Sequence, residues 1–458
     1  MSGPIPNLPT NLGSVLQIVH SCQSFNAVAN QLLPTLRGLV WNNAGQAESM
    51  LGGLIDGADP LLNMGLGTGG GRQAAAYTLG TLYMLSARLS MTSPPQTSFQ
   101  TIVEWCSTFE PHQARLASDR VGKLAKGIVR WAEQSGQPED ALEPLRLLVT
   151  RYPPSPAYLT NIHPVFVQLC CTTRHFMLAL PILSVPITEI DKDVSDLHYT
   201  DNLLYHYCGG VALGALKRFR EAADFFEIAV SSPASVASAI QVEAYKKLSL
   251  IQLILYGKTA SPPKYTSPAV SRAFRNSSTT QPYLKFINAI EITDREAARK
   301  LAKDVEAFQT DNNMGLVQQV LDRLPWLAVK KLKETYMKLA LEEIGREIGL
   351  PDDIKAVRAL IVDMIAAGEL SASIHPDGTV SFEEESALLP QPSKLQIETA
   401  LVQARDAVER LAELDRSIGR SRDYIQKALH QRDSGGMGWQ DEESMMPPMR
   451  GESWEDNL

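Results

Sequence analysis

The stretch 203–236, LLYHYCGGVALGALKRFREAADFFEIAVSSPASV, decides the fold that we expect for this chain. It fits two antiparallel helices in about 34 residues, the length of a tetratricopeptide-like repeat. Gly209 and Gly210 allow the helices to approach closely, and the segment 217–219 supplies the turn. The remaining contact positions hold Leu213, Ala222, Phe226 and Ala229, with Pro233 near the end. This pattern predicts a helical hairpin that stacks on similar neighbours.

A second window, residues 122–155, follows the same template. Its second-helix and closing positions hold Ala141, Leu145, Leu148 and Pro153. Any helical hairpin can show such spacing, but two windows agree and the surrounding sequence is also helical. We therefore predict a mostly α-helical solenoid of tetratricopeptide-like repeats over residues 121–325.

The pattern changes after Trp326. Residues 328–348 and 352–367 are predicted as two helices, and 370–374 and 379–382 as two short strands. Asp377-Gly378 between these strands is a strong hairpin signal. Helix, helix and hairpin form the outline of a winged helix, which we assign to residues 326–389.

The ends of the chain differ from its middle. Residues 1–120 are predicted as a helical region interrupted by a glycine-rich loop at 52–71. A Pro-Gln-Pro linker at 390–392 precedes a single long helix at 393–430. Residues 431–458 are rich in Gly, Met, Pro and acidic residues, and are predicted to be disordered.

Composition argues against several classes of function. The chain has 458 residues and a net charge of −8, of which 431–458 contributes −5, leaving −3 for the rest. Such a body has no excess of cations for phosphate backbones or anionic lipid. The sequence has neither a secretory signal at its start nor an apolar run of about 18 residues, so we expect no membrane contact. Five cysteines without a metal or disulfide spacing favour a reducing compartment.

Few motifs suggest chemistry. Gly65, Gly67 and Gly70 satisfy G-x-G-x-x-G, but no strand precedes them, as a dinucleotide site requires. His198, Asp201 and His206 cluster in sequence without a zinc-ligand spacing. Cys170 and Cys171 lie in an apolar helix and are interpreted as packing residues. We therefore expect no catalytic, cofactor-binding or metal-binding residue and no enzymatic activity.

The predicted winged helix is better suited to protein than to nucleic acid. Residues 350–385 contain eight acids and two basic residues, Lys355 and Arg358, a balance of −6 that repels phosphates. The outer strand of such a small sheet leaves backbone groups free to pair with another chain. The residues assigned to this contact are Ser371, Ser373, Ile374, Asp377, Gly378 and Val380.

The long terminal helix carries a narrow apolar stripe. Its members recur at four- and three-residue steps, which is typical of a coiled-coil seam, although Asp415 interrupts them. They are Ile397, Leu401, Ala404, Val408, Leu411 and Ile418. We predict that the stripe packs against helices from other chains; packing within its own chain is the alternative.

Helical repeats that run into a winged helix and a terminal helix resemble the PCI subunits of the proteasome lid, the COP9 signalosome and a translation initiation factor. Among the PCI subunits, this chain most resembles the family of signalosome subunit 3, and five of its segments carry that similarity. They are VEAYKK at 242–247, LILYGK at 253–258, PKYTS at 263–267, DNNMGLV at 311–317 and GTVSF at 378–382.

The resemblance implies a non-catalytic scaffold in a hetero-oligomeric complex that removes a ubiquitin-like modifier from cullins. In that family a zinc isopeptidase on a different subunit performs the chemistry, and PCI subunits associate through winged helices and a C-terminal helical bundle. Subunits 1 and 8 are the expected neighbours, and nucleus and cytoplasm the expected location. A PCI subunit of the proteasome lid, a nucleic-acid-binding winged helix and an enzyme remain as alternatives, in falling order.

Overall fold

The computed structural model describes residues 11–22, 24–42, 44–54, 58–66, 75–91, 97–292, 294–304, 306–350, 353–382, 394–422 and 424–426. The linker predicted at 390–392 and the tail predicted at 431–458 lie outside these residues. The chain divides into two compact units. The first comprises residues 1–336 and 340–361, and the second residues 337–339 and 362–458.

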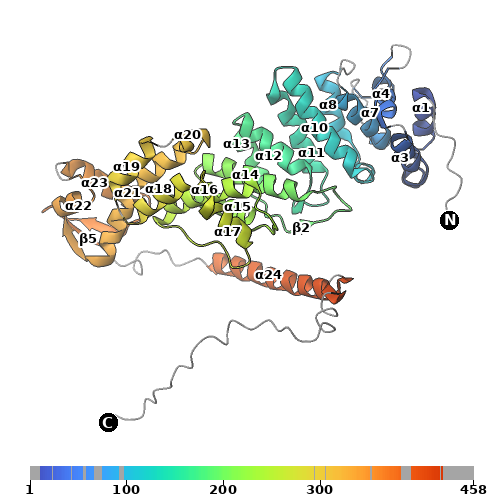
Figure 1. Ribbon diagram of the computed structural model, residues 1–458. Helices are drawn as coiled ribbons and strands as arrows, with labels where there is room; N and C mark the ends of the chain where they lie inside the picture. Colours follow the sequence, from blue (N-terminus) through green and yellow to red (C-terminus); the bar gives the residue numbers. More distant parts are fainter. Residues whose placement is uncertain are drawn as a thin grey trace, which may run out of the picture. The chain divides into compact units, whose positions relative to one another are not determined.

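The first unit begins with short helices that pack around α7, in the blue part of Figure 1. The described part of the glycine-rich stretch predicted as a loop contains a short helix, α5, which starts with Pro60 at its first turn and is capped by Asp59. The bounds are α1 (Leu12–Ser21), α2 (Phe25–Ala27), the π-helix η1 (Val28–Leu32), α3 (Leu33–Asn42), α4 (Ala44–Leu51), α5 (Pro60–Asn63), α7 (Thr78–Ser90), α8 (Phe99–Thr108) and α9 (Pro111–Arg115).

Helical hairpins form the middle of this unit, as the repeat pattern predicted. A Cβ atom on Gly209 would lie 2.6 Å from Phe225 Cδ1, so α14 and α15 approach as closely as the glycines allow. Lys217 has a φ of 60° in the turn between them. The bounds are α10 (Ser118–Gln134), η2 (Pro138–Ala141), α11 (Leu142–Arg151), β1 (Tyr158–Leu159), α12 (Ile162–Thr172), α13 (Phe176–Leu183), β2 (Glu189–Ile190), α14 (Tyr199–Ala215), α15 (Phe219–Ser231) and α16 (Ala239–Tyr256), with β1 and β2 parallel.

Further helices extend the solenoid beyond α16. A second apolar cluster, which includes Leu250, Phe286 and Val320, joins them to the repeats. The bounds are α17 (Pro268–Asn276), α18 (Gln281–Glu291), α19 (Arg295–Asp304), α20 (Ala307–Thr310) and α21 (Met314–Thr335).

A buried polar network connects α16 to the start of α21. Lys246 Nζ lies 2.6 Å from Glu243 Oε1 and 2.8 Å from Asp311 Oδ2, and Tyr283 donates to the same Asp311 oxygen at 2.8 Å. Asn313 donates to the Tyr283 hydroxyl at 2.7 Å. Since Lys246 is buried, its charge depends on these carboxylates. The network thus brings together the segments 242–247 and 311–317, two of those that carried the family resemblance.

One prediction for the region after Trp326 was wrong. Residues 328–348 do not form one helix: α21 runs to Thr335, and β3 (Lys338–Ala340) and α22 (Leu341–Glu347) follow. Phe382 donates its N–H to the Met337 carbonyl at 2.8 Å, so strand pairing overrides the local helical pattern. Pro325 lies inside α21.

The winged-helix elements are otherwise as predicted. The sequence continues with α23 (Ile354–Ala366), β4 (Ala372–Ile374) and β5 (Thr379–Phe382), and the sheet has the order β3-β5-β4. The terminal helix predicted at 393–430 is shorter: α24 (Lys394–Arg420), shown in red in Figure 1, ends before Ser421, which is not helical, and residues 422 and 424–426 are helical again.

Candidate protein-interaction surfaces

The apolar stripe of α24 is exposed along its whole length. All six predicted residues, Ile397, Leu401, Ala404, Val408, Leu411 and Ile418, are exposed. Val408 and Leu411, at its centre, expose 65% and 66% of their surface. Large apolar side chains repeated along one helix at such exposure are typical of a surface that a partner covers.

Two further residues widen the stripe. Leu414 lies three residues after Leu411 and four before Ile418, and it is 54% exposed. It therefore adds apolar surface beside Asp415, where the predicted seam is interrupted. Val402, next to Leu401, is exposed as well. Neither residue was predicted, because the prediction followed a single seam, although the same three- and four-residue spacing includes Leu414.

The residues predicted for the winged-helix contact lie on the β4–β5 hairpin or immediately before it. Ile374 pairs with Val380 and Ser373 with Ser381 in antiparallel register. The turn is closed by the Gly378 N–H, which donates to the His375 carbonyl at 3.1 Å, and Gly378 has a φ of 83°. Asp377 accepts the Thr379 N–H at 2.9 Å, and this bond to the carboxylate lowers the pKa of Asp377. Asp377 is accordingly a turn-stabilising residue.

β4 is an edge strand, and its free edge has a defined set of donors. His375 donates its N–H to the Thr379 carbonyl at 2.8 Å, which sets the alternation along the strand. The N–H and C=O groups of Ser373 therefore face β5, while those of Ala372 and Ile374 point away from β5. Such an edge can accept a strand from another chain.

The predicted residues of this hairpin differ in accessibility. Ser371, Ser373, Ile374 and Gly378 are half-buried, and Asp377 is exposed. Val380 is fully buried, so its side chain is part of the fold and not of an accessible surface. Because β5 lies between β3 and β4, the backbone of Val380 is not at the free edge of the sheet either, and Val380 does not belong to an accessible contact surface of this chain.

The histidines considered as metal ligands have structural roles. Asp201 accepts the His198 N–H at 2.9 Å and caps α14. His206 Nδ1 lies 3.0 Å from the Asn202 carbonyl, and burial lowers the pKa of His206. No group of three or more His, Cys, Asp or Glu side chains within the described residues could hold a metal ion.

The remaining candidates for chemistry lie in packing environments or outside the described residues. Cys170 is buried, and burial raises the pKa of its thiol to about 12. Gly65 follows helix α5 and not a strand, while Gly67 and Gly70 are outside the described residues. None of the described helices is long and apolar enough to cross a lipid bilayer.

Helical repeats that end in a winged helix define the class of PCI-domain proteins. The PCI domain family model matches residues 301–384 of this chain. The family model for the N-terminal helical repeats of COP9 signalosome complex subunit 3 matches residues 73–270. The first of these matches includes the winged helix, and the second covers most of the helical repeats.

Curated relatives agree with this assignment. COP9 signalosome complex subunit 3 of Arabidopsis thaliana is 30% identical over 368 residues, which cover 78% of this chain and 83% of that protein. The Dictyostelium discoideum protein of the same name is 29% identical over 370 residues, 78% of this chain and 86% of that protein. This chain belongs to the COP9 signalosome subunit 3 family.

Proposed function

We propose that this chain is a non-catalytic scaffold subunit of a COP9 signalosome. The observation that best supports this proposal is the exposed apolar stripe of α24. This helix follows a PCI domain in a chain of the subunit 3 family. In a complex, helices of other subunits cover this stripe in a C-terminal bundle. Burial of its large apolar side chains would supply about 1.5–3 kcal/mol each before the entropic costs of association.

The winged helix provides a second contact in this proposal. The outward N–H and C=O groups of Ala372 and Ile374 pair with the edge of a neighbouring subunit. Subunits 1 and 8 are the neighbours that we propose. The acidic balance of residues 350–385 favours this protein contact over nucleic acid.

The chain contributes to the removal of the modifier from cullins by positioning other subunits. It holds neighbouring subunits while another subunit, of the metalloprotease type, removes the ubiquitin-like modifier. The sequence supports this role because it lacks the H-x-H pattern that such a zinc site needs. We propose that the complex acts in the nucleus and the cytoplasm.

Affinity purification of the tagged native chain tests the proposal. Mass spectrometry should identify signalosome subunits, with 1 and 8 among those that remain after partial dissociation. Recovery of proteasome lid subunits in their place would favour the related complex and refute this assignment. The purified chain alone should release no modifier from a modified cullin, with or without added zinc.

A further inference from the structure

Two cysteines from different repeat helices lie together where α12 packs along α14. Cys171 Sγ lies 3.3 Å from the carbonyl oxygen of Cys208, and a hydrogen bond also connects the two thiols. Cys171 belongs to the last turn of α12 and precedes Cys208 by 37 residues. The fold therefore brings together two thiols that no sequence motif relates.

The two thiols differ in their access to solvent. Of the five cysteines, all of which the structure describes, Cys171 alone is not buried. Its neighbour in sequence, Cys170, is fully buried, and Cys208 exposes only 6% of its surface. Cys171 was predicted to be a packing residue, but part of its surface meets solvent, so a small solute can reach this residue and not the other four.

Donors from α14 favour the ionised form of Cys171. The Cys208 thiol donates to the Cys171 sulfur, and this bond lowers the pKa of Cys171, to which the Ala212 N–H adds a second hydrogen bond. The same bond between the thiols, together with burial, raises the pKa of Cys208. Cys171 is therefore the nucleophile of the pair, and Cys208 is the thiol that keeps its proton.

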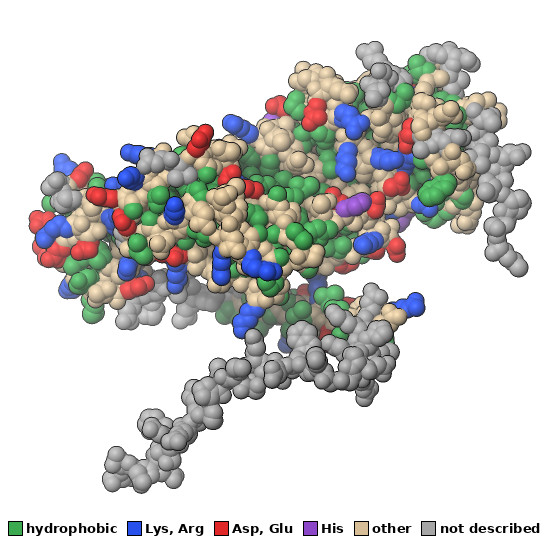
Figure 2. All heavy atoms as spheres, in the orientation of Figure 1, with side chains coloured by type: hydrophobic (Ala, Val, Ile, Leu, Met, Phe, Trp, Pro, Cys, Tyr) green, Lys and Arg blue, Asp and Glu red, His purple; other side chains and the backbone are tan. Residues whose placement is uncertain are grey.

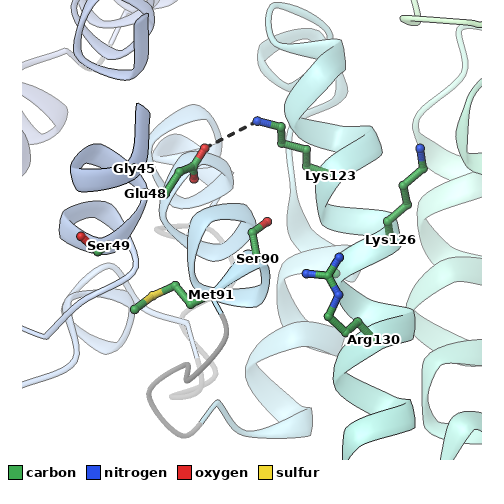
Figure 3. A pocket seen from close by; sticks show the side chains of 9 residues that line it. Gly45, Glu48, Ser49, Ser90, Met91, Lys123, Lys126 and Arg130 are labelled. Atoms are coloured by element: carbon green, nitrogen blue, oxygen red, sulfur yellow. Dashed lines mark ion pairs between the residues drawn. The ribbon is translucent and has the colours of Figure 1, made fainter. Parts of the chain in front are cut away.

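Cations, which activate many reactive cysteines, are not responsible here. The hollow of about 610 Å³ between α4, α7 and α10 gathers Lys123, Lys126 and Arg130 beside Glu48 (Figure 3), but none of the described residues that line it is a cysteine. Figure 2 shows hydrophobic side chains in the middle of the first unit, where α13 and α14 lie. Neutral donors from α14 thus distinguish Cys171 from the other thiols.

We propose that Cys171 and Cys208 form a peroxide-sensitive pair, in which Cys171 is oxidised first and a disulfide to Cys208 follows. The Cys171 thiolate attacks one oxygen of hydrogen peroxide, so that an S–O bond forms, the O–O bond breaks and hydroxide leaves. The Cys208 sulfur then attacks the Cys171 sulfur, the S–O bond breaks, and the departing hydroxide takes the Cys208 proton. In total, two thiols lose two electrons and one peroxide becomes two waters, the first hydroxide being neutralised by the proton that Cys171 had released.

The position of Cys171 makes this bond geometrically accessible. A disulfide requires two Cα atoms within about 7 Å of each other. Cys171 lies one residue before the end of α12, where the helical backbone adjusts more easily than in its middle. The bond would fasten the end of α12 to α14 and enclose α13 between them. The proposal is independent of α24 and of the winged-helix edge.

Peptide mapping of the full chain, without any substitution, tests the proposal. The reduced chain is treated with hydrogen peroxide near pH 7, alkylated, digested and analysed by mass spectrometry without reduction. A peptide that links Cys171 to Cys208 should accumulate and disappear after treatment with dithiothreitol. It should form about tenfold faster than any oxidation product of Cys22, Cys106 or Cys170, since susceptibility follows thiolate character and exposure.

Three variants separate the two steps. Cys208→Ala should stop at the sulfenic acid of Cys171, which dimedone labels, and Cys171→Ser should give neither the label nor the disulfide. Cys170→Ala is the matched control, because it removes the adjacent thiol and should leave the Cys171–Cys208 bond unchanged. The proposal is overturned if Cys171 pairs with Cys170 in the unsubstituted chain, if another cysteine is oxidised first, or if peroxide leaves all five thiols reduced.

Discussion

Helices α16 and α24 both present large apolar side chains, nearly all round the helix in α16 and along one stripe in α24, and they have opposite surroundings. In α16 the residues from Lys246 to Ile254 are all buried, even two lysines, because α15, α17 and α21 surround it. In α24 every stripe residue is exposed. The comparison shows that large apolar side chains on a helix indicate a surface that will be covered, but not which chain covers it. We interpret α16 as part of the chain's own core and α24 as a surface completed by other subunits.

Truncating one leucine on each helix should give the largest difference in stability between the two helices. Leu250→Ala, in α16, should lower the free energy of unfolding of the isolated chain by about 2–5 kcal/mol, because it leaves a cavity in a packed core. Leu411→Ala, in α24, should change it by less than about 0.5 kcal/mol. Urea unfolding followed by circular dichroism measures both. Equal losses would place the α24 stripe in the chain's own core.

Removing Asp311 should have the next largest effect. Asp311→Ala leaves Lys246 buried with a single carboxylate, Glu243, and should cost about 3 kcal/mol of stability. Asp415→Ala, on exposed α24, is the matched control and should be nearly silent. Thermal unfolding of the two variants measures this difference. Equal unfolding midpoints would contradict our account of the polar network around Lys246.

Acidification should weaken the repeats through His163. Burial lowers the pKa of His163 to about 4, from an ordinary value of about 6.5, and its ring Nδ1 accepts the Thr160 N–H at 3.1 Å. Because the folded-state pKa lies below the unfolded one, this contribution to stability is fully present above pH 6.5 and is lost as pH falls toward 4. The loss amounts to about 2–3 kcal/mol.

Urea unfolding at several pH values between 4 and 7 measures this dependence. His163→Gln should flatten the slope of unfolding free energy against pH in that window, although buried His206 will retain part of it. His198→Gln, at an exposed position, serves as the control and should keep the slope of the original chain. An unchanged slope in His163→Gln would show that the histidine does not titrate in this way.

Much of the fold was predictable because local signals and tertiary contacts agree. Gly209 and Gly210 leave room for the close packing of α14 against α15, and Gly378 supplies the positive φ of the β4–β5 turn, so both hairpins form where the sequence indicated them. The strand β3 was missed because residues 338–340 have a helical pattern, and their pairing with β5 depends on residues about 40 positions away.

The candidate sites were predictable to different degrees. The α24 stripe follows from spacing alone, and its exposure is consistent with the prediction that other chains cover it. The burial of Val380 depends on the sheet and not on local sequence.

The edge of β4 offers a smaller test of the assembly. Ala372→Pro removes an N–H that points away from β5, at the first residue of the strand, where proline is tolerated. The variant should stay folded within about 1 kcal/mol and lose the neighbour that pairs with this edge in pull-down assays. Ser373→Pro is the contrasting variant, because its N–H faces β5 and its loss should unfold the hairpin. Retention of every neighbour by folded Ala372→Pro would refute the edge contact.

The central claim is that the α24 stripe belongs to an interface between subunits, and one double variant tests it most directly. Val408→Asp with Leu411→Asp should abolish co-purification of the partner subunits, while the isolated chain keeps its thermal unfolding midpoint because both positions are exposed. Arg405→Asp with Glu409→Asp makes the same change of net charge on the polar side of the helix and should assemble normally. Normal assembly of the Val408–Leu411 variant, or an early unfolding midpoint of the isolated variant chain, would contradict the claim.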